Sequence, residues 1–244
     1  LNLNIILNSV YKKCIMKVIK LDAIDSTNEF LKGLSKKQEL ENFTVVSAEK
    51  QTKGKGQMGA IWASDASKNL IMSVLVKDFL SGIDQLFNLN IVVSLAVIEV
   101  LESLNIPNLS IKWPNDIMSY NKKIGGILIE NSIKSDGTIV SVVGFGLNVN
   151  QTNFDNLPKA SSLAVVSGKE YDKESLLISV CEVIEKKIAS YHFLPIEFWD
   201  KYTKKLYKNG VPMSFSDINK NHFMGIIQGV SAIGKLRALL EDDR

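Results

Sequence analysis

Hydrophobic residues recur along the chain in two patterns: short runs of strand length, and longer stretches with the period of a helix. The strand-length runs are Met16–Leu21, Thr44–Ser47, Leu70–Val76 and Thr138–Asn150. Helices are predicted where apolar positions line one face, or most of the surface, of a longer stretch. They are a helix capped by Ser26 or Thr27 with Phe30, Leu31 and Leu34 on its apolar face, Asp84–Leu104, Asp172–Ser190 and Pro195–Leu206.

The pattern changes near Asn209, where short apolar runs separated by glycine and asparagine turns predict a small β subdomain. These runs are Val211–Phe215, Phe223–Val230 and Leu236–Leu240. A chain of 244 residues suits one domain with a smaller one attached. We therefore divide it into an N-terminal extension (residues 1–15), a main domain (residues 16–208) and a C-terminal subdomain (residues 209–244).

The stretch Ile111–Glu130 predicts a hairpin with polar chemistry at both ends. Ile117–Tyr120 and Ile124–Ile129 are apolar runs of strand length, and Asn121-Lys122 predicts the turn between them. A strand should break at Pro114, because proline cannot donate a ladder hydrogen bond.

That break leaves Lys112, Asn115 and Asp116 at a strand end, while Lys123 lies just past the turn. The Gly125-Gly126 pair lets another backbone or a ligand come close. Two lysines, a carboxylate, an amide and bare backbone suit an anionic ligand that undergoes chemistry. Spacing alone is equally compatible with a surface hairpin whose lysines are simply solvated.

A glycine-rich segment follows the strand Thr44–Ser47, and its Gly54, Gly56 and Gly59 formally satisfy the dinucleotide pattern G-x-G-x-x-G. The context of this segment excludes a dinucleotide-binding site, because the first glycine lies several residues beyond the strand and no amphipathic helix begins after Gly59. Neither a P-loop nor the motifs that accompany a kinase glycine loop occur. What remains is a mobile, glycine-rich, lysine-bearing loop, which is compatible with a plain flexible surface loop or with a functional one.

Composition restricts the class of protein further. Hydrophobic residues make up 45% and charged residues 23%, which is ordinary for a soluble globular protein. The net charge of +3 is mildly basic and the only arginines are Arg237 and Arg244, which argues against nucleic-acid binding. Cys14 and Cys181 form no motif, which fits a reducing cytoplasm.

No targeting or metal-binding pattern stands out in the sequence. Leu1–Ile15 is broken by asparagines and is a poor signal peptide, so we expect an extension before a functional start at Met16, without a helix-turn-helix domain. No run of about 18 apolar residues occurs, and no transmembrane helix is expected. His192 and His222 are isolated, so no structural metal site is expected.

The hairpin residues also carry a family resemblance. Lys112-Trp113-Pro114-Asn115-Asp116, with Lys123 and Gly126–Glu130 in register behind it, resembles the signature of biotin–protein ligases. Five blocks match in family order over roughly Met16 to Arg244. The resemblance implies an α+β fold, with a mixed or antiparallel sheet and packed helices like those of class II aminoacyl-tRNA synthetases. It also implies an SH3-like β subdomain, which we expect to be incomplete because the family normally continues for one or two more strands.

In that family the glycine-rich loop closes over biotin and the adenylate. Lys55 stands where arginine is usual, which keeps the charge and loses the bidentate fork. Gln57 and Met58 stand where many relatives carry further basic residues, and we therefore hypothesise some leakage of biotinyl-AMP. The positions that match the loop pattern are Gly54, Gly56, Gly59 and Trp62.

The resemblance implies roles for individual residues. The implied catalytic residues are Lys123, as the cation between the biotin carboxylate and the α-phosphate, Asp116, which takes or orients the proton of the acceptor amine, and Lys55. The implied ATP-binding residues are Trp62, Lys112, Asn115 and Asn148, with Ala160–Leu163 resembling the loop over adenine. The implied biotin-binding residues are Ser26, Thr27, Asn28, Gln51, Gly54, Lys55, Gly56, Lys123 and Gly126.

The implied reaction has two steps. ATP and biotin give biotinyl-5′-AMP and pyrophosphate, and a lysine of a biotin carboxyl carrier protein then attacks the mixed anhydride. Mg²⁺ is expected to be held mainly by the ATP phosphates, and the protein to be a cytoplasmic monomer or homodimer without nucleic-acid or membrane partners. Two alternatives stay open: a lipoate–protein ligase of the same fold, and a non-catalytic module that binds biotinyl-AMP.

Overall fold

A seven-stranded mixed sheet forms the centre of the computed structural model, which describes residues 16–155, 157–192, 195–217 and 219–240. The strand order is β1 (Val18–Ile24), β2 (Val45–Gln51), β3 (Leu70–Lys77), β7 (Ile139–Leu147), β6 (Lys122–Ile133), β5 (Asp116–Ser119) and β4 (Leu109–Lys112). β1 runs parallel to β2, and the other neighbouring strands pair antiparallel. The predicted extension, residues 1–15, lies outside the described residues.

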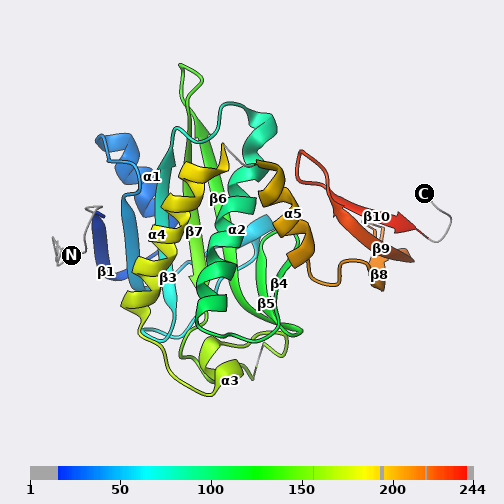
Figure 1. Cartoon of the computed structure of the whole chain (residues 1–244). Helices are drawn as coiled ribbons and strands as arrows, with labels where there is room; N and C mark the ends of the chain where they lie inside the picture. The colour runs from blue at the N-terminus through cyan, green and yellow to red at the C-terminus, as the bar shows by residue number, and fades with distance from the viewer. Residues whose placement is uncertain (1–15, 156, 193–194, 218, 241–244) are drawn as a thin grey trace.

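Helices cover both faces of this sheet (Figure 1). α1 (Thr27–Lys37) packs on one face through the fully buried Leu31. α2 (Leu86–Ser103) and α4 (Lys173–Tyr191) lie side by side on the other face, and α5 (Pro195–Lys205) packs against α2. The sheet is therefore enclosed by two separate hydrophobic clusters, one under each set of helices.

Side-chain caps fix where two of the helices begin. The Ser26 hydroxyl accepts a hydrogen bond from the N–H of Glu29 at 3.4 Å, at the start of α1. The Asp172 carboxylate accepts from the N–H of Ser175 at 2.8 Å, at the start of α4. Each cap satisfies a backbone donor that the first helical turn leaves unpaired, and both confirm the predicted helix starts.

Two helical segments differ from the sequence prediction. The long helix begins at Leu86 instead of Asp84, because Ile83–Gln85 form a 3₁₀ turn. A short helix, α3 (Leu163–Ser167), is capped by Ser162 where the sequence predicts only loop. Five residues are too few to show the apolar periodicity by which a helix is recognised.

α2 is apolar around most of its circumference and lies in the core. With the 3₁₀ turn before it, Ile83–Ser103 has a mean hydropathy of 1.7 and is long and apolar enough to cross a membrane by composition. In the structure 67% of the apolar 18-residue window within that stretch is buried, which is the position of a core helix. Its buried Asn90 accepts from Ser94 at 3.1 Å and donates to the carbonyl of Pro114 at 3.1 Å. The core helix thereby supports the predicted site segment.

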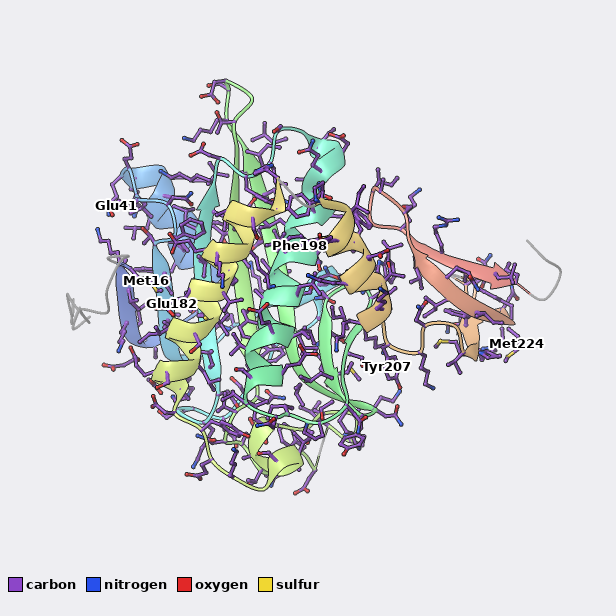
Figure 2. All side chains as sticks on the ribbon, in the orientation of Figure 1. Met16, Glu41, Glu182, Phe198, Tyr207 and Met224 are labelled. Atoms are coloured by element: carbon purple, nitrogen blue, oxygen red, sulfur yellow. The ribbon has the colours of Figure 1, made fainter. Side chains whose placement is uncertain are left out.

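A second, three-stranded antiparallel sheet lies beside α5 (Figure 1). Its strand order is β10 (Leu236–Leu240), β9 (His222–Val230) and β8 (Pro212–Ser216). The Trp113 indole N–H donates to the carbonyl of Gly234 at 2.8 Å and joins this sheet to the main one. Figure 2 shows Tyr207 at the junction and Met224 on the far side of the small sheet. The three predicted strands are present, while the SH3-like assignment and the domain boundary stay predictions.

Candidate active site

One cavity gathers most of the residues that the sequence analysis singled out. Its volume is about 240 Å³, and it lies where the start of α1, the end of β2, the first half of β6 and the end of β7 meet. The predicted residues that line it are Ser26, Thr27, Asn28, Gln51, Lys55, Gly56, Trp62, Asn115, Asp116, Lys123 and Gly126. The predicted residues that do not line it are Gly54, Lys112 and Asn148.

A buried hydrogen-bond network holds the polar end of the cavity. Gln51 Oε1 accepts from the Thr27 N–H at 2.8 Å and from the Thr27 hydroxyl at 3.0 Å. The Ser73 hydroxyl bonds to Thr27 Oγ1 at 2.7 Å and to Asn28 Oδ1 at 2.6 Å. Each group fixes the orientation of the next, so the cavity presents preorganised donors and acceptors.

Ser73 is a site residue that the sequence analysis missed. It lies in β3 and is fully buried among apolar neighbours. A lone hydroxyl in a strand buried on both faces needs a hydrogen-bond partner, and this is the signal that could have marked it.

Lys123 and Asp116 form an ion pair inside the cavity. Lys123 Nζ lies 2.6 Å from Asp116 Oδ1, and their side chains are 36% and 22% exposed. The ammonium also lies 5.6 Å from the centroid of the Trp62 ring, within the range of a cation–π contact. A cation and a carboxylate therefore stand together with access to solvent, where a bound anion can reach the one and an incoming amine the other.

A β-bulge turns these two side chains to the same face of the sheet. Asp116 pairs with Gly126, and Met118 pairs with Lys123. Asp116 and Met118 are two residues apart and share a face, whereas Gly126 and Lys123 would face opposite sides of a regular strand. The register shift between Ile117 and Met118 removes this conflict. The pair thus depends on the bulge as well as on the two residue types.

The glycine-rich loop (residues 52–62) folds back on itself at the rim of the cavity. The Gly56 N–H donates to the carbonyl of Ala60 at 2.7 Å, and the Trp62 N–H donates to the carbonyl of Gly54 at 3.0 Å. A Cβ at Gly54 would collide with the Trp62 carbonyl, so this glycine shapes the loop and does not line the cavity. Met58 at the tip is fully exposed.

Trp62 lies against glycines of the main sheet. A Cβ on Gly146 would stand 2.5 Å from the indole ring, and one on Gly126 would stand 3.5 Å from it. Because Gly146 of β7 has no side chain, the Trp62 indole can lie directly against this strand. The Trp62 indole N–H is buried and has no hydrogen-bond partner within the described residues. A buried donor normally finds an acceptor, and a ligand in the cavity can supply one.

Three predicted ATP-binding residues lie at or beyond the edge of the cavity. Asn115 donates to the carbonyl of Ile127 at 2.7 Å and anchors the segment before β5. Lys112 is exposed on β4. Asn148 is buried and donates to the carbonyl of Ser161 at 2.9 Å, which ties the following loop to the end of β7. Their contacts with a nucleotide stay predictions.

Lys55 belongs to a chain of alternating charges at the rim. Its Nζ lies 2.9 Å from Glu29 Oε1; Lys32 Nζ lies 3.4 Å from the same oxygen and 2.9 Å from Glu130 Oε1. Asn28 donates to the other Glu130 oxygen at 2.9 Å and links the chain to the cavity. The hydrogen bond from Lys55 lowers the pKa of Glu29, and the bond to Glu130 raises the pKa of Lys32. The sequence analysis did not single out Glu29 or Lys32, because their links to the site, Lys55 and Glu130, lie 26 and 98 positions away in the sequence.

Comparison with known proteins identifies the family. A family model described as the biotin/lipoate A/B protein ligase family matches residues 21–149, more than half of the chain. The chain belongs to the biotin/lipoate A/B protein ligase family. The matched segment includes every residue that lines the cavity, so the family match and the candidate site coincide.

Named proteins resemble this family member at about 30% identity. The bifunctional ligase/repressor BirA of Bacillus spizizenii is 31% identical over 194 residues, which cover 76% of this chain and 59% of that protein. The biotin–[acetyl-CoA-carboxylase] ligase of Mycobacterium tuberculosis is 30% identical over 150 residues, which cover 60% and 54% of the two chains. The matched part thus spans 54–59% of the length of these two relatives.

A solved structure from the same family agrees over most of the chain. The biotin protein ligase from Aquifex aeolicus in complex with biotin and ATP is 29% identical, covers 93% of both chains and superposes with a TM-score of 0.77. This similarity confirms the predicted fold class for the mixed sheet and its packed helices.

Proposed function

We propose that this protein is an ATP-dependent biotin–protein ligase, which makes biotinyl-5′-AMP and transfers biotin to a lysine of a carrier protein. The observation that carries the proposal is the Lys123–Asp116 pair in one cavity with the Thr27–Gln51 network. Hydroxyl and amide groups suit the ureido ring of biotin, which needs both donors and acceptors. The ion pair supplies the two charges that the two chemical steps require.

In the first step, a carboxylate oxygen of biotin attacks the α-phosphorus of ATP and the bond to pyrophosphate breaks. The two anionic groups repel each other, so a cation must lie between them. Lys123 fills this role because its Nζ is partly exposed inside the cavity. Lys55 at the rim is the second cation.

Mg²⁺ is part of the proposal as an ion held by the ATP phosphates. Among the described residues, no three His, Cys, Asp or Glu side chains gather into a metal site, and Asp116 is already engaged by Lys123. This donor set fits an ion that binds through substrate phosphates and a few waters. When bound, the ion neutralises charge on the leaving pyrophosphate.

In the second step, the amine of the carrier lysine attacks the acyl carbon, the bond from that carbon to the AMP oxygen breaks, and AMP leaves. The attacking amine must lose a proton. Asp116 accepts or orients that proton, since its carboxylate lies within the cavity beside the proposed phosphate-binding cation. The acceptor is the carboxyl carrier protein of a biotin-dependent carboxylase in the cytoplasm.

Incubation with ATP, biotin and a purified carrier domain tests this function. The expected result is biotin-dependent release of pyrophosphate and a carrier whose mass increases by one biotinyl group. A parallel reaction with lipoate and its carrier domain separates the two classes that the family model joins. Preferred transfer of lipoate would replace the proposal, and binding of biotinyl-AMP without pyrophosphate release would reduce the protein to a binding module.

A further inference from the structure

We infer that Glu29 sets how long the glycine-rich loop retains the adenylate, because its carboxylate competes with the adenylate phosphate for Lys55. This inference rests on the proposed function. Lys55 lines the cavity, but its ammonium is held 2.9 Å from Glu29 Oε1. Glu29 does not line the cavity. The loop cation is thus positioned by a partner outside the site, and it must leave that partner to bind a phosphate.

The exposure of the Lys55–Glu29 pair makes such an exchange feasible. The Lys55 and Glu29 side chains are 53% and 45% exposed. Ion pairs at this exposure contribute little net stability, because water solvates both groups once they separate. A phosphate carries at least one full negative charge and can therefore displace the carboxylate without a large cost.

A second cation compensates Glu29 when Lys55 leaves. Lys32 Nζ lies 3.4 Å from the Glu29 oxygen that Lys55 contacts, and Glu130 holds Lys32 in place at 2.9 Å. The Lys32 and Glu130 side chains are only 24% and 25% exposed, so this part of the chain of charges is more buried than the Lys55 end. Lys55 can depart while Glu29 keeps a neighbouring positive charge.

The first turn of α1 keeps Glu29 ionised and in place. The backbone N–H of Glu29 donates to the Ser26 hydroxyl, so the cap does not depend on the Glu29 side chain. A carboxylate in the first helical turn is further stabilised by the positive end of the helix dipole. The competitor is therefore present as an anion at neutral pH, and its removal leaves the helix start intact.

Glu29→Gln is the test variant, and Glu174→Gln is its matched control. Glu174 also lies in the first turn of a helix, α4, and pairs with Lys20 at 2.7 Å at similar exposure, 48% and 39%. Each variant is loaded with labelled biotin and ATP without carrier, then chased with unlabelled biotinyl-AMP. Release of the labelled adenylate should be about two- to fivefold slower in Glu29→Gln than in the wild type, the size expected of an exposed ion pair, and unchanged in Glu174→Gln.

A double-mutant cycle with Lys55→Ala assigns the effect to the pair. Lys55→Ala should release the adenylate faster, and adding Glu29→Gln to it should change nothing further. Equal or faster release in Glu29→Gln, or a slowing that persists without Lys55, would overturn the inference. Either of these two results leaves the proposed function intact, because the wild type still forms biotinyl-AMP. A wild type that forms no adenylate would instead overturn the proposed function.

Discussion

The Lys123–Asp116 ion pair is partly open to solvent, at 36% and 22% exposure, so each partner can exchange the other for a ligand. A fully buried pair would hold its partners too firmly, since separating buried charges costs several kcal/mol. A pair of this kind suits residues that act in successive steps. In the proposed reaction, Lys123 faces the phosphate while the adenylate forms, and Asp116 is then free to serve the incoming amine.

Asp116→Asn should separate the two steps. The amide keeps the shape of the side chain and loses the base, so transfer from preformed biotinyl-AMP should fall by about 10²-fold, the lower end of general base catalysis. Adenylate formation should fall much less. Rapid-quench measurements of both steps on the same preparation check this, and equal losses in the two steps would contradict the assignment.

Gly146→Ala should disturb the site by displacing Trp62. The added methyl would stand 2.5 Å from the indole, and overpacking of this kind costs about 1–3 kcal/mol. We expect the KM for ATP to rise by about tenfold or more, since about 1.4 kcal/mol corresponds to that factor. Gly33→Ala is the control, because a Cβ at Gly33 meets open space. A KM unchanged in Gly146→Ala would show that Trp62 does not shape the cavity.

For single residues, the sequence predicts which side chains belong to the site better than it predicts which residues they contact. Ser26, Asn28 and Lys123 follow from short motifs, and all three line the cavity. The contact of Lys55 with Glu29 and the bond of Ser73 to Thr27 join residues 26 and 46 positions apart. Such pairings depend on how elements pack, which local pattern does not encode.

At the scale of elements, caps and bulges decide where side chains point. The starts of α1 and α4 were predictable, because a capping side chain and the donor it satisfies lie three residues apart. The bulge that turns Lys123 toward Asp116 could not be predicted, because it arises from the pairing of β5 with β6. The same limit applies to α3, whose five residues carry no helical period.

Asp172→Ala should destabilise the protein by about 1 kcal/mol through loss of the α4 cap. The bond from Ser175 lowers the pKa of Asp172 below its ordinary value of 3.8. Because the folded state has the lower pKa, the Asp172 carboxylate stabilises the fold fully above pH 3.8. This stabilisation is lost as pH falls through the pKa of the folded state. Urea unfolding at pH 7 and pH 3 measures both effects. The free energy of unfolding of the alanine variant should differ from that of the wild type less at pH 3 than at pH 7. An equal difference at the two pH values would show that the Asp172 carboxylate does not act through this cap.

At the scale of the whole molecule, one hydrogen bond joins the small sheet to the segment that carries Asp116. Trp113 donates to the Gly234 carbonyl, and a Cβ at Gly234 would collide with the Phe87 ring on α2. The turn at Gly234, between β9 and β10, therefore packs against both α2 and the segment that carries Asp116. The fold class was predictable from the order of the sequence blocks, whereas this docking contact spans 121 residues and could not be predicted.

Trp113→Phe should loosen the small sheet without unfolding the main one. It removes one hydrogen bond, worth about 1 kcal/mol, and keeps an aromatic ring at that position. Amide hydrogens of β9 and β10 should exchange about fivefold faster, while those of β3 and β7 keep their protection. Hydrogen exchange read by mass spectrometry checks this, and unchanged exchange in β9 and β10 would show that the contact does not hold the sheets together.

In the proposed reaction, Lys123 is the cation that permits adenylate formation. This role is tested by the rate of biotin-dependent pyrophosphate release by Lys123→Ala, without carrier protein. Lys122→Ala is the matched control, because Lys122 is the adjacent exposed lysine and does not line the cavity. We predict that Lys123→Ala loses about 10²- to 10³-fold in rate, as when a preorganised charge contact is removed, and that Lys122→Ala retains the wild-type rate. Wild-type adenylate formation by Lys123→Ala would show that Lys123 is not the cation that this step requires.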